Sequence, residues 1–375
     1  MNKGPDYYDP PALATHPNGD QFAGSETCRE CHGEIYESHL ETAHYNTSAM
    51  ASSRNIKGDF REGSNRVELP EVDFVMQKKG STVYQHTQNK EGIDQKEPDK
   101  VDIVIGSGVK GQSFLTWDND RLFQLQVSYF PPTQTWINSP GYPPEILQRP
   151  ILDGCLKCHV TFAKNKDFSG AGNRYEANQV LFGVDCERCH RPAAKHVSYH
   201  RKHPEIKSAM FMLKLDTLPR QQRLDVCAQC HSGPRDRLLQ GNSFSFLSGE
   251  TLDDYARNFY TGQPDAELDV HGNQYGLLAS SLCFIKSENM DCSTCHSPHK
   301  NQRDKTDYFN QQCLSCHNSG TTSRGFREHI TASITSNCIE CHMPNIASKV
   351  MSVQLAGDSV ATAVYVRTHL IGIYR

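Results

Sequence analysis

The sequence predicts a mainly α-helical fold with extensive loops and one small antiparallel β insertion. Three observations lead to this prediction. A short pattern of cysteine and histidine recurs along the chain, and helical periodicity follows several of its copies. Alternation of apolar and polar residues, which is typical of strands, is confined to residues 66–150. Only 37% of the 375 residues are hydrophobic, which is little for an ordinary apolar core.

The recurring pattern is Cys-x-x-Cys-His, and its seven copies use fourteen of the fifteen cysteines. The cysteine pairs are Cys28 and Cys31, Cys155 and Cys158, Cys186 and Cys189, Cys227 and Cys230, Cys292 and Cys295, Cys313 and Cys316, and Cys338 and Cys341. The histidines that follow them are His32, His159, His190, His231, His296, His317 and His342. Two thiols at this spacing form thioethers with one haem, and the next residue supplies the proximal imidazole. The pattern therefore predicts seven covalently bound haem c groups.

Zinc sites and disulfides are the alternatives for this pattern. Zinc requires paired Cys-x-x-Cys units or a Cys₂His₂ spacing, and it does not require a histidine directly after every second cysteine. Disulfides within each pair do not require that histidine either. We therefore favour haem. Haem faces also supply the buried apolar surface that the composition lacks, so helices and loops are expected to surround a core of haems.

Four segments are expected along the chain. Residues 1–24 form an extended N-terminal arm, residues 25–65 the first haem segment, residues 66–150 a β-rich insertion, and residues 151–375 a haem domain with motifs 2 to 7, all within one multihaem unit. Two hairpins are predicted in the insertion, one turning at Lys79-Gly80 and one at Asp118-Asn119-Asp120. Outside the motifs, residues 247–262 give the clearest helical pattern.

Eleven further histidines compete with methionine for the opposite face of each iron, and their number favours His/His ligation. His299 follows His296 by three residues, so it cannot turn back onto the same iron and should serve a neighbouring haem. His196, His200 and His203 share one helical face, which fits a helix between two haems more simply than a zinc site. The first set of distal candidates is His44, His196, His299, His329 and His369. The second set is His200, His203, His271 and His16, and His39 and His86 rank below both.

Cys283 lies outside the motifs. We interpret it as a small buried thiol, with an intersubunit disulfide or a sulfur beside a catalytic haem as alternatives.

The expected location is periplasmic or extracellular, including the cell surface, because haem is attached to cysteine outside the cytoplasm. The first residues lack the apolar stretch of a signal sequence, so none is expected within this numbering, and a lipid anchor upstream is an alternative. No 18-residue apolar run predicts a transmembrane helix. The net charge of −4 with mixed signs gives no indication of nucleic-acid binding.

Several segments resemble one family of multihaem c-type cytochromes, that of the tetrahaem electron acceptor of hydroxylamine oxidoreductase and its multihaem relatives. These segments are GSETCRECHGEIYESHLETAH, GVDCERCHRPAAKH, CSTCHSPH and CIECHMP. The resemblance implies distal ligands at His44, His196, His299 and His329, and it places His369 at a C-terminal ligand position. The chain lacks the Cys-x-x-Cys-Lys motif of the related nitrite reductases, and its seven motifs differ from the eight haems of hydroxylamine oxidoreductases.

We expect an electron carrier rather than a catalyst, and the sequence assigns no catalytic residue. Electrons would pass along a chain of mostly bis-His haems to other redox proteins, or through an oligomer or filament of identical copies. The alternative is an oxidoreductase that acts on a small nitrogen or sulfur compound at one five-coordinate haem, with Cys283, Tyr275, Lys286 or a non-ligating histidine among His196, His200 and His203 as a candidate for moving protons. A zinc-binding scaffold is a third reading.

Overall fold

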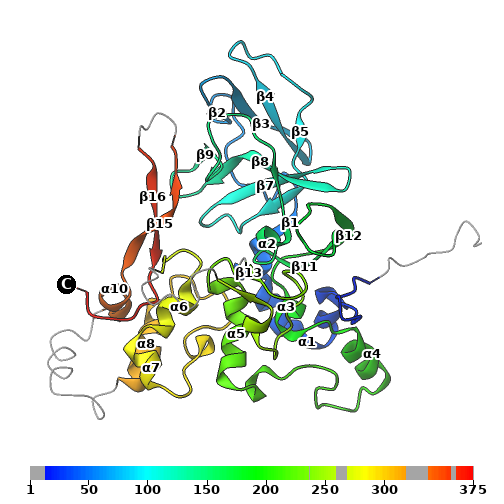
Figure 1. The fold of residues 1–375 in the computed structure, drawn as a ribbon, viewed down its shortest axis with the longest axis vertical. Helices are drawn as coiled ribbons and strands as arrows, with labels where there is room; N and C mark the ends of the chain where they lie inside the picture. Colours follow the sequence, from blue (N-terminus) through cyan, green and yellow to red (C-terminus); the bar gives the residue numbers. More distant parts are fainter. Residues whose placement is uncertain (1–12, 236, 259–267, 318–336, 356–359, 375) are drawn as a thin grey trace, which may run out of the picture.

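The computed structural model of the protein describes residues 13–235, 237–258, 268–317, 337–355 and 360–374. Strands dominate the upper part of the molecule in Figure 1, and the helices that carry the Cys-x-x-Cys-His motifs lie in the lower part. Helices and strands each cover 26% of the described residues. The prediction of a mainly α-helical fold is therefore wrong. A motif needs only about one helical turn to place its two cysteines, and many connections between motifs form antiparallel strands instead of longer helices.

The upper part contains two antiparallel sheets. The four-stranded sheet has the order β2 (Arg66–Glu68), β3 (Asp73–Lys79), β4 (Thr82–Gln88), β5 (Asp99–Lys100). The six-stranded sheet has the order β1 (Ser48–Met50), β6 (Ile103–Ile105), β7 (Gln112–Asp118), β8 (Arg121–Phe130), β10 (Arg149–Pro150), and β9 (Thr135–Asn138) also pairs with β8. The hairpins β3–β4 and β7–β8 confirm the two predicted turns. Asn119 adopts φ 55° at the second turn, a conformation that Asn tolerates well.

An apolar core joins the two sheets. Phe74 and Met76 of β3 pack with Phe114 of β7 and Val127 of β8, and all four are almost completely buried. Trp136 of β9 closes this core, and its indole N–H donates to the carbonyl of Asp59 at 2.7 Å. The two sheets thus form a packed body of their own without any haem motif.

The helices are mostly short. They are α1 (Ser25–Leu40), α2 (Asp153–Leu156), α3 (Cys186–His190), α4 (Ala194–Lys202), α5 (Arg220–His231), α6 (Gln274–Ala279), α7 (Leu282–Lys286), α8 (Thr306–Cys316) and α10 (Cys338–His342). The 3-10 turns are η1 (Tyr45–Thr47), η2 (Leu215–Thr217), η3 (Leu252–Asp254) and η4 (Cys292–Thr294). Within the described chain, no helix combines the length and the hydropathy that crossing a membrane requires.

The helix predicted over residues 247–262 is wrong in its described part, which contains only η3 and β14 (Ala256–Arg257). The backbone N–H of Leu252 donates to the carboxylate of Asp225 at 3.1 Å. The carbonyl of Ala256 accepts from the Arg235 guanidinium at 2.7 Å. These tertiary hydrogen bonds use backbone groups that a helix would pair internally, so tertiary structure overrides the local pattern.

Three further strand pairs lie among the haem motifs, where loops were expected. They are β11 (Val160–Asn165) with β12 (Tyr175–Phe182), β13 (Arg237–Leu238) with β14, and β15 (Asn345–Val353) with β16 (Thr362–Arg367). The β15–β16 hairpin, red in Figure 1, stands beside the upper sheets. Val353 and Val364 of this hairpin pack against Phe130 and Ile137, so the C-terminal part of the chain contacts both halves of the molecule.

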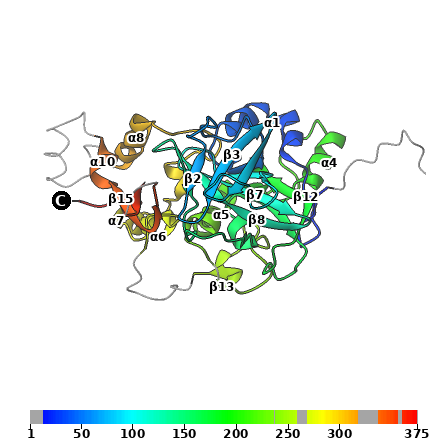
Figure 2. The same cartoon turned by 90° about the horizontal axis from the view of Figure 1, so that it is seen from above.

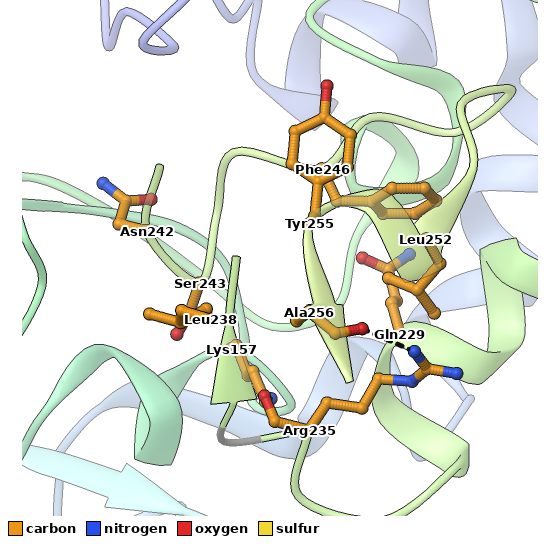
Figure 3. A pocket seen from close by; sticks show the side chains of 10 residues that line it. All are labelled: Lys157, Gln229, Arg235, Leu238, Asn242, Ser243, Phe246, Leu252, Tyr255 and Ala256. Atoms are coloured by element: carbon orange, nitrogen blue, oxygen red, sulfur yellow. Dashed lines mark hydrogen bonds between the residues drawn. The ribbon is translucent and has the colours of Figure 1, made fainter. Parts of the chain in front are cut away.

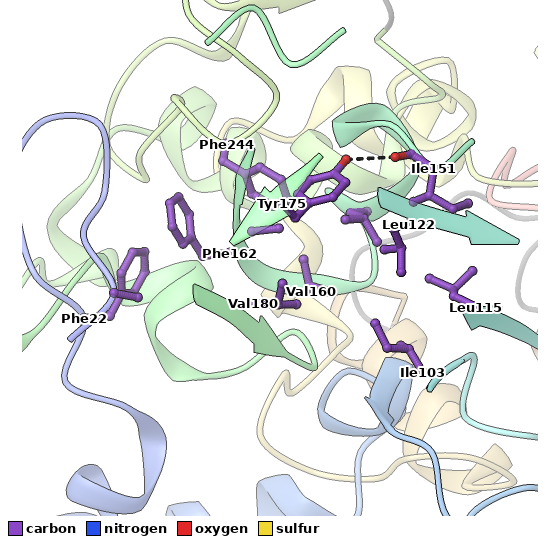
Figure 4. Packing of buried hydrophobic residues seen from close by; sticks show 13 residues of the cluster. Phe22, Ile103, Leu115, Leu122, Ile151, Val160, Phe162, Tyr175, Val180 and Phe244 are labelled. Carbon is purple, nitrogen blue, oxygen red and sulfur yellow. Dashed lines mark hydrogen bonds between the residues drawn. The ribbon is translucent and has the colours of Figure 1, made fainter. Parts of the chain in front are cut away.

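A second core connects the sheets to the motif-bearing half (Figure 4). Leu115 and Leu122 of the six-stranded sheet belong to the same cluster as Phe162 and Tyr175 of the β11–β12 pair. The Tyr175 hydroxyl donates to the carbonyl of Ile151 at 3.0 Å, as Figure 4 shows. Ala14 and Phe22 are buried in this core, so residues 13–24 pack against the body of the protein.

Gly183 allows a close crossing of two segments that lead to haem motifs. Its φ is +68°, and an added Cβ would clash with the carbonyl oxygen of Tyr45. We expect Gly183→Ala to destabilise the protein by more than the roughly 1–2 kcal/mol that a left-handed conformation alone costs an L-residue. Gly80→Ala is the matched control, because Gly80 has φ +61° with nothing within 4 Å of an added Cβ. Denaturant unfolding should show a larger loss of unfolding free energy for Gly183→Ala than for Gly80→Ala. Equal losses would show that the contact with Tyr45 does not require a glycine at position 183.

Candidate haem sites

All seven motifs lie on helical turns. Motifs 1, 3, 4, 6 and 7 are on α1, α3, α5, α8 and α10, whereas α2 and η4 contain only the first cysteine of motifs 2 and 5, and a turn follows. Residues three apart on a helical turn face the same side, so each cysteine pair can reach one macrocycle. The histidine ends the helix in α3, α5 and α10, and it follows the last residue of α8. In α1 the helix is interrupted at His32, which has φ −118° and ψ 38°. In these five motifs the regular helix thus ends or breaks at the histidine, which frees the imidazole to turn away from the helix axis.

Acidic caps fix two of these turns. Asp185 accepts the backbone N–H of Cys186 at 2.7 Å at the start of α3. Asp291 forms a capping box at η4, and its carboxylate also accepts from the Arg223 guanidinium at 2.5 Å. A carboxylate at a helix N-terminus satisfies otherwise unpaired N–H groups. These two caps hold the first cysteine of motifs 3 and 5 in position.

Three histidine pairs have the spacing expected of two imidazoles on one metal. Imidazole nitrogens bind metals such as zinc at about 2.0–2.1 Å, and a ring centroid lies about 1.1 Å behind its nitrogen, so two centroids across one metal are roughly 6.3 Å apart. The observed centroid distances are 6.1 Å for each of His44 with His231, His190 with His299, and His296 with His369. Each pair joins a motif histidine to a first-set candidate from a distant segment.

His39 also approaches His299, with a centroid distance of 6.3 Å. Both ring nitrogens of His39 are engaged, however. Nε2 lies 3.2 Å from the carbonyl of Val184, and Nδ1 lies 3.4 Å from the hydroxyl of Thr42. His190 is therefore the better partner for His299, and their rings are nearly parallel at 13°.

Burial keeps several of these imidazoles neutral, which is the form that binds a metal. It lowers the pKa of His44 to about 4 and the pKa of His369 to about 4. Burial also lowers the pKa of His159, and the nearby His271 adds to the effect. Within the described chain, Nδ1 of His159 and Nδ1 of His369 are buried without a hydrogen-bond partner. Such donor atoms fit a bound metal centre.

Hydrogen bonds orient three further rings. Nδ1 of His196 donates to the carbonyl of Met210 at 2.8 Å, Nδ1 of His342 donates to the carbonyl of Gly372 at 2.7 Å, and Nδ1 of His231 lies 3.2 Å from the side-chain oxygen of Gln274. A bond of this kind fixes the tautomer and leaves Nε2 with a lone pair for a metal.

The three histidines predicted to share one face of α4 differ in their contacts. His196 and His200 pack at a tilt with centroids 4.6 Å apart, and Nε2 of His200 accepts the backbone N–H of Met210 at 3.3 Å. His203 packs at a tilt on Tyr199, and its Nδ1 faces Glu205. Nε2 of His200 is thus engaged by the protein backbone, which favours His196 over His200 as a ligand.

Two lower-ranked histidines have both ring nitrogens within hydrogen-bond distance of other protein groups. Both ring nitrogens of His16 lie within hydrogen-bond distance of Asn18 and Phe244, which counts against a role as ligand. His86 is held in the same way by Asp94 and Gln77. His329 lies outside the described residues and stays a prediction.

Contacts between cysteines show which motifs are neighbours. The side chains of Cys28 and Cys186 lie close enough to interact, as do those of Cys158 and Cys230, and those of Cys227 and Cys292. These interactions lower the pKa of Cys28, Cys230 and Cys292. Cys189 also lies close enough to Cys230 for their charges to interact. The same holds for Cys295 and Cys316, for Cys313 and Cys295, and for Cys313 and Cys338.

Cys283 of α7 is half-buried and lies among the cysteines of motifs 5 and 6. Burial raises the pKa of its thiol, so the protonated form predominates. None of the described cysteines, Cys283 included, forms a disulfide.

Comparisons with known proteins bear on the fold and on haem attachment. The family profile described as "Cytochrome c554 and c-prime" matches residues 145–191, which contain motifs 2 and 3. The crystal structure of the outer cell wall cytochrome OcwA superposes with a TM-score of 0.58 at 17% identity, over 93% of this chain and 79% of that one. The chain has the fold of a multihaem cytochrome. The match across motifs 2 and 3 supports covalently bound haem c in this cytochrome.

A second structure, the undecaheme cytochrome from the S-layer of Carboxydothermus ferrireducens, gives a TM-score of 0.39 at 18% identity. That alignment covers 84% of this chain and 45% of the other. No curated protein matches the sequence.

Proposed function

We propose that this cytochrome carries seven haems with mostly bis-His ligation and relays electrons between partner redox proteins. Each bound haem supplies one iron that takes up and releases a single electron. The observation that carries the proposal is the set of three histidine pairs with ring centroids 6.1 Å apart. Two imidazoles on one iron leave no position for a substrate, so these sites favour electron transfer over chemistry on a bound molecule.

The geometry supports a specific set of axial pairs. In this proposal His299 faces His190, His44 faces His231, and His369 faces His296. His271 is assigned to His159 because the two imidazoles lie close enough for the charge of His271 to lower the pKa of His159. Motif 1 is assigned to His196, because Arg201 of α4 pairs with Glu30 of motif 1 at 2.6 Å and so holds α4 beside this motif. His329 remains the proposed ligand from the segment between motifs 6 and 7.

The cysteine contacts support an order for the relay. They connect motif 1 to motif 3, motif 3 to motif 4, motif 4 to motif 5, motif 5 to motif 6, and motif 6 to motif 7. Motif 2 joins this line through motif 4, by the contact of Cys158 with Cys230. In both views α10 with motif 7 lies on one side of the molecule and α4 lies on the opposite side (Figures 1 and 2). We infer a line of six sites across the molecule with one branch.

Motifs 1 and 7 are therefore the proposed points of electron entry and exit. Cys31 of motif 1 and Cys341 of motif 7 are both exposed, which gives a redox partner access to either end. The partners are other redox proteins or further copies of this chain, in an oligomer or filament. A periplasmic or extracellular location is consistent with covalent haem, and OcwA is named for the outer cell wall.

Electron paramagnetic resonance of the oxidised cytochrome tests this function. We expect haem analysis to give seven haems per chain and the spectrum to contain only low-spin haem signals, unchanged by nitrite, sulfite or cyanide. A high-spin iron that binds one of these molecules would contradict the relay and support the alternative of an oxidoreductase. A reduced spectrum without the sharp α band of c-type haem would contradict both functions.

A further inference from the structure

Two basic residues lie inside neighbouring motifs and contact each other. Arg188 precedes the second cysteine of motif 3, and Lys157 precedes the second cysteine of motif 2. The Arg188 guanidinium donates to the backbone carbonyl of Lys157 at 3.0 Å and lies 5.3 Å from the centroid of the Phe244 ring. Within the described chain, Nε of Arg188 is buried and has no hydrogen-bond partner. A guanidinium is charged at any physiological pH, so this position carries a fixed positive charge.

Lys157 is 5% exposed, and its amine donates to the carbonyls of Pro234 and Arg235. Figure 3 shows the small cavity beside it, which has a volume of about 20 Å³. This is room for about one water molecule. The cavity is lined by Lys157, Arg235, two amides, two hydroxyls and aromatic and aliphatic groups, with no carboxylate. No acidic group in this cavity therefore offsets the charge of Lys157.

The nearest carboxylates are directed elsewhere. Glu187, although adjacent to Arg188, accepts the backbone N–H groups of Ala23, Gly24 and Ala193 at 2.7–2.8 Å. Asp185 caps the helix of motif 3. Asp253 pairs with Arg235 at 2.7 Å. Among the described residues, neither Arg188 nor Lys157 forms a salt bridge of its own, so both cations stay uncompensated by protein acids.

The two cations lie where three motifs meet. The thiol of Cys230 in motif 4 is 3.5 Å from the carbonyl oxygen of Lys157, and it also contacts Cys158 of motif 2. Cys189 of motif 3 directly follows Arg188, and Cys158 of motif 2 directly follows Lys157. Motifs 2, 3 and 4 thus share one buried region of positive potential.

We propose that Arg188 and Lys157 make the junction of motifs 2, 3 and 4 the place where an added electron is held most strongly. This inference rests on the proposed relay. A buried positive charge stabilises the reduced state of a nearby redox centre, because reduction adds one negative charge. A unit charge about 10 Å from such a centre, at an effective dielectric constant near 20, changes the equilibrium by about tenfold. The junction therefore acts as an electron reservoir between the ends of the line.

Potentiometric titration of the haem absorbance tests the reservoir. Arg188→Gln and Lys157→Gln should each lower the highest of the resolved potentials by about 59 mV, which is a tenfold change for a one-electron couple. Arg188→Lys keeps the charge and should leave the titration curve close to that of the native protein. Arg29→Gln is the matched control, because Arg29 is also inside a motif but is exposed and pairs with Glu37 at 2.9 Å.

The two glutamine variants test the inference independently. If one of them fails to incorporate haem, the other still measures the effect on the potential. Unchanged high potentials in a variant with full haem content would overturn the inference, as expected if a haem propionate neutralises the cations. A shift of the same size in Arg29→Gln would overturn it as well, because the effect would then be general to charges near haem. The spin state separates the two proposals. If all haems stay low-spin while the potentials do not move, the reservoir fails and the relay stands.

Discussion

Replacing His299 by alanine is expected to convert one low-spin haem to a high-spin haem and leave the other six unchanged. His299 lies 6.1 Å from His190, ring centroid to ring centroid, and in the proposed assignment it fills the second axial position at motif 3. Its removal opens that position, so the variant should also gain a cyanide-binding site. His299→Met should instead keep the iron low-spin and raise its potential, because thioether ligation favours the reduced iron. Electron paramagnetic resonance and redox titration measure the two effects.

His39→Ala is the matched control for this experiment. His39 is almost as close to His299 as His190 is, with centroids 6.3 Å apart against 6.1 Å, but both of its nitrogens are engaged by neighbouring groups. Its replacement should leave the low-spin count unchanged. A high-spin signal in His39→Ala together with an unchanged spectrum in His299→Ala would reverse the assignment at motif 3.

The position of His299 shows what spacing in the sequence can predict. Three residues cannot turn His299 back onto the iron of His296, so local geometry alone excludes that pairing. Its actual neighbour, His190, is more than one hundred residues earlier, and nothing local selects it. The same limit applies to His44, which lies beside His231 in the structure. Sequence reasoning thus finds the candidates, and tertiary structure pairs them.

The error in fold class has a related cause. The hairpins of the β insertion were predictable because alternation and turn residues are local signals. The β15–β16 strands carry weaker alternation, and their stability depends on contacts of Val353 and Val364 with Phe130 and Ile137 in the upper half of the molecule. Such contacts do not show in a local pattern.

Arg188 and Lys157 are also not singled out in the sequence analysis, although both lie between the two cysteines of a motif. A basic residue between two haem-binding cysteines is usually solvated, as Arg29 is. The local sequence does not distinguish the exposed from the buried case. A search for basic residues at these positions finds the candidates, and the structure then separates them, because Lys157 and Nε of Arg188 are buried whereas Arg29 is exposed.

The branched order of the sites leads to the second large effect. Motif 4 is the proposed junction, so replacing Cys227 and Cys230 by alanine should remove one haem and separate motifs 1 and 3 from motifs 5, 6 and 7, with motif 2 cut off from both groups. Replacing Cys155 and Cys158 also removes one haem, but motif 2 is a branch and the line from motif 1 to motif 7 stays intact. Haem content should fall equally in the two variants, from seven to six, while electron exchange is impaired only in the first.

Pulse radiolysis measures this difference. A radical dose of less than one electron per chain reduces one haem at most, and the movement of that electron to other haems is followed by the haem absorbance. The native protein and the motif 2 variant should redistribute in one fast phase. In the motif 4 variant the electron stays in the half that received it, so a much slower phase through collisions between molecules should appear and depend on protein concentration. Equal kinetics in the two variants would refute the junction, since the contacts of Cys230 with Cys158 and of Cys227 with Cys292 are what place motif 4 between the other sites.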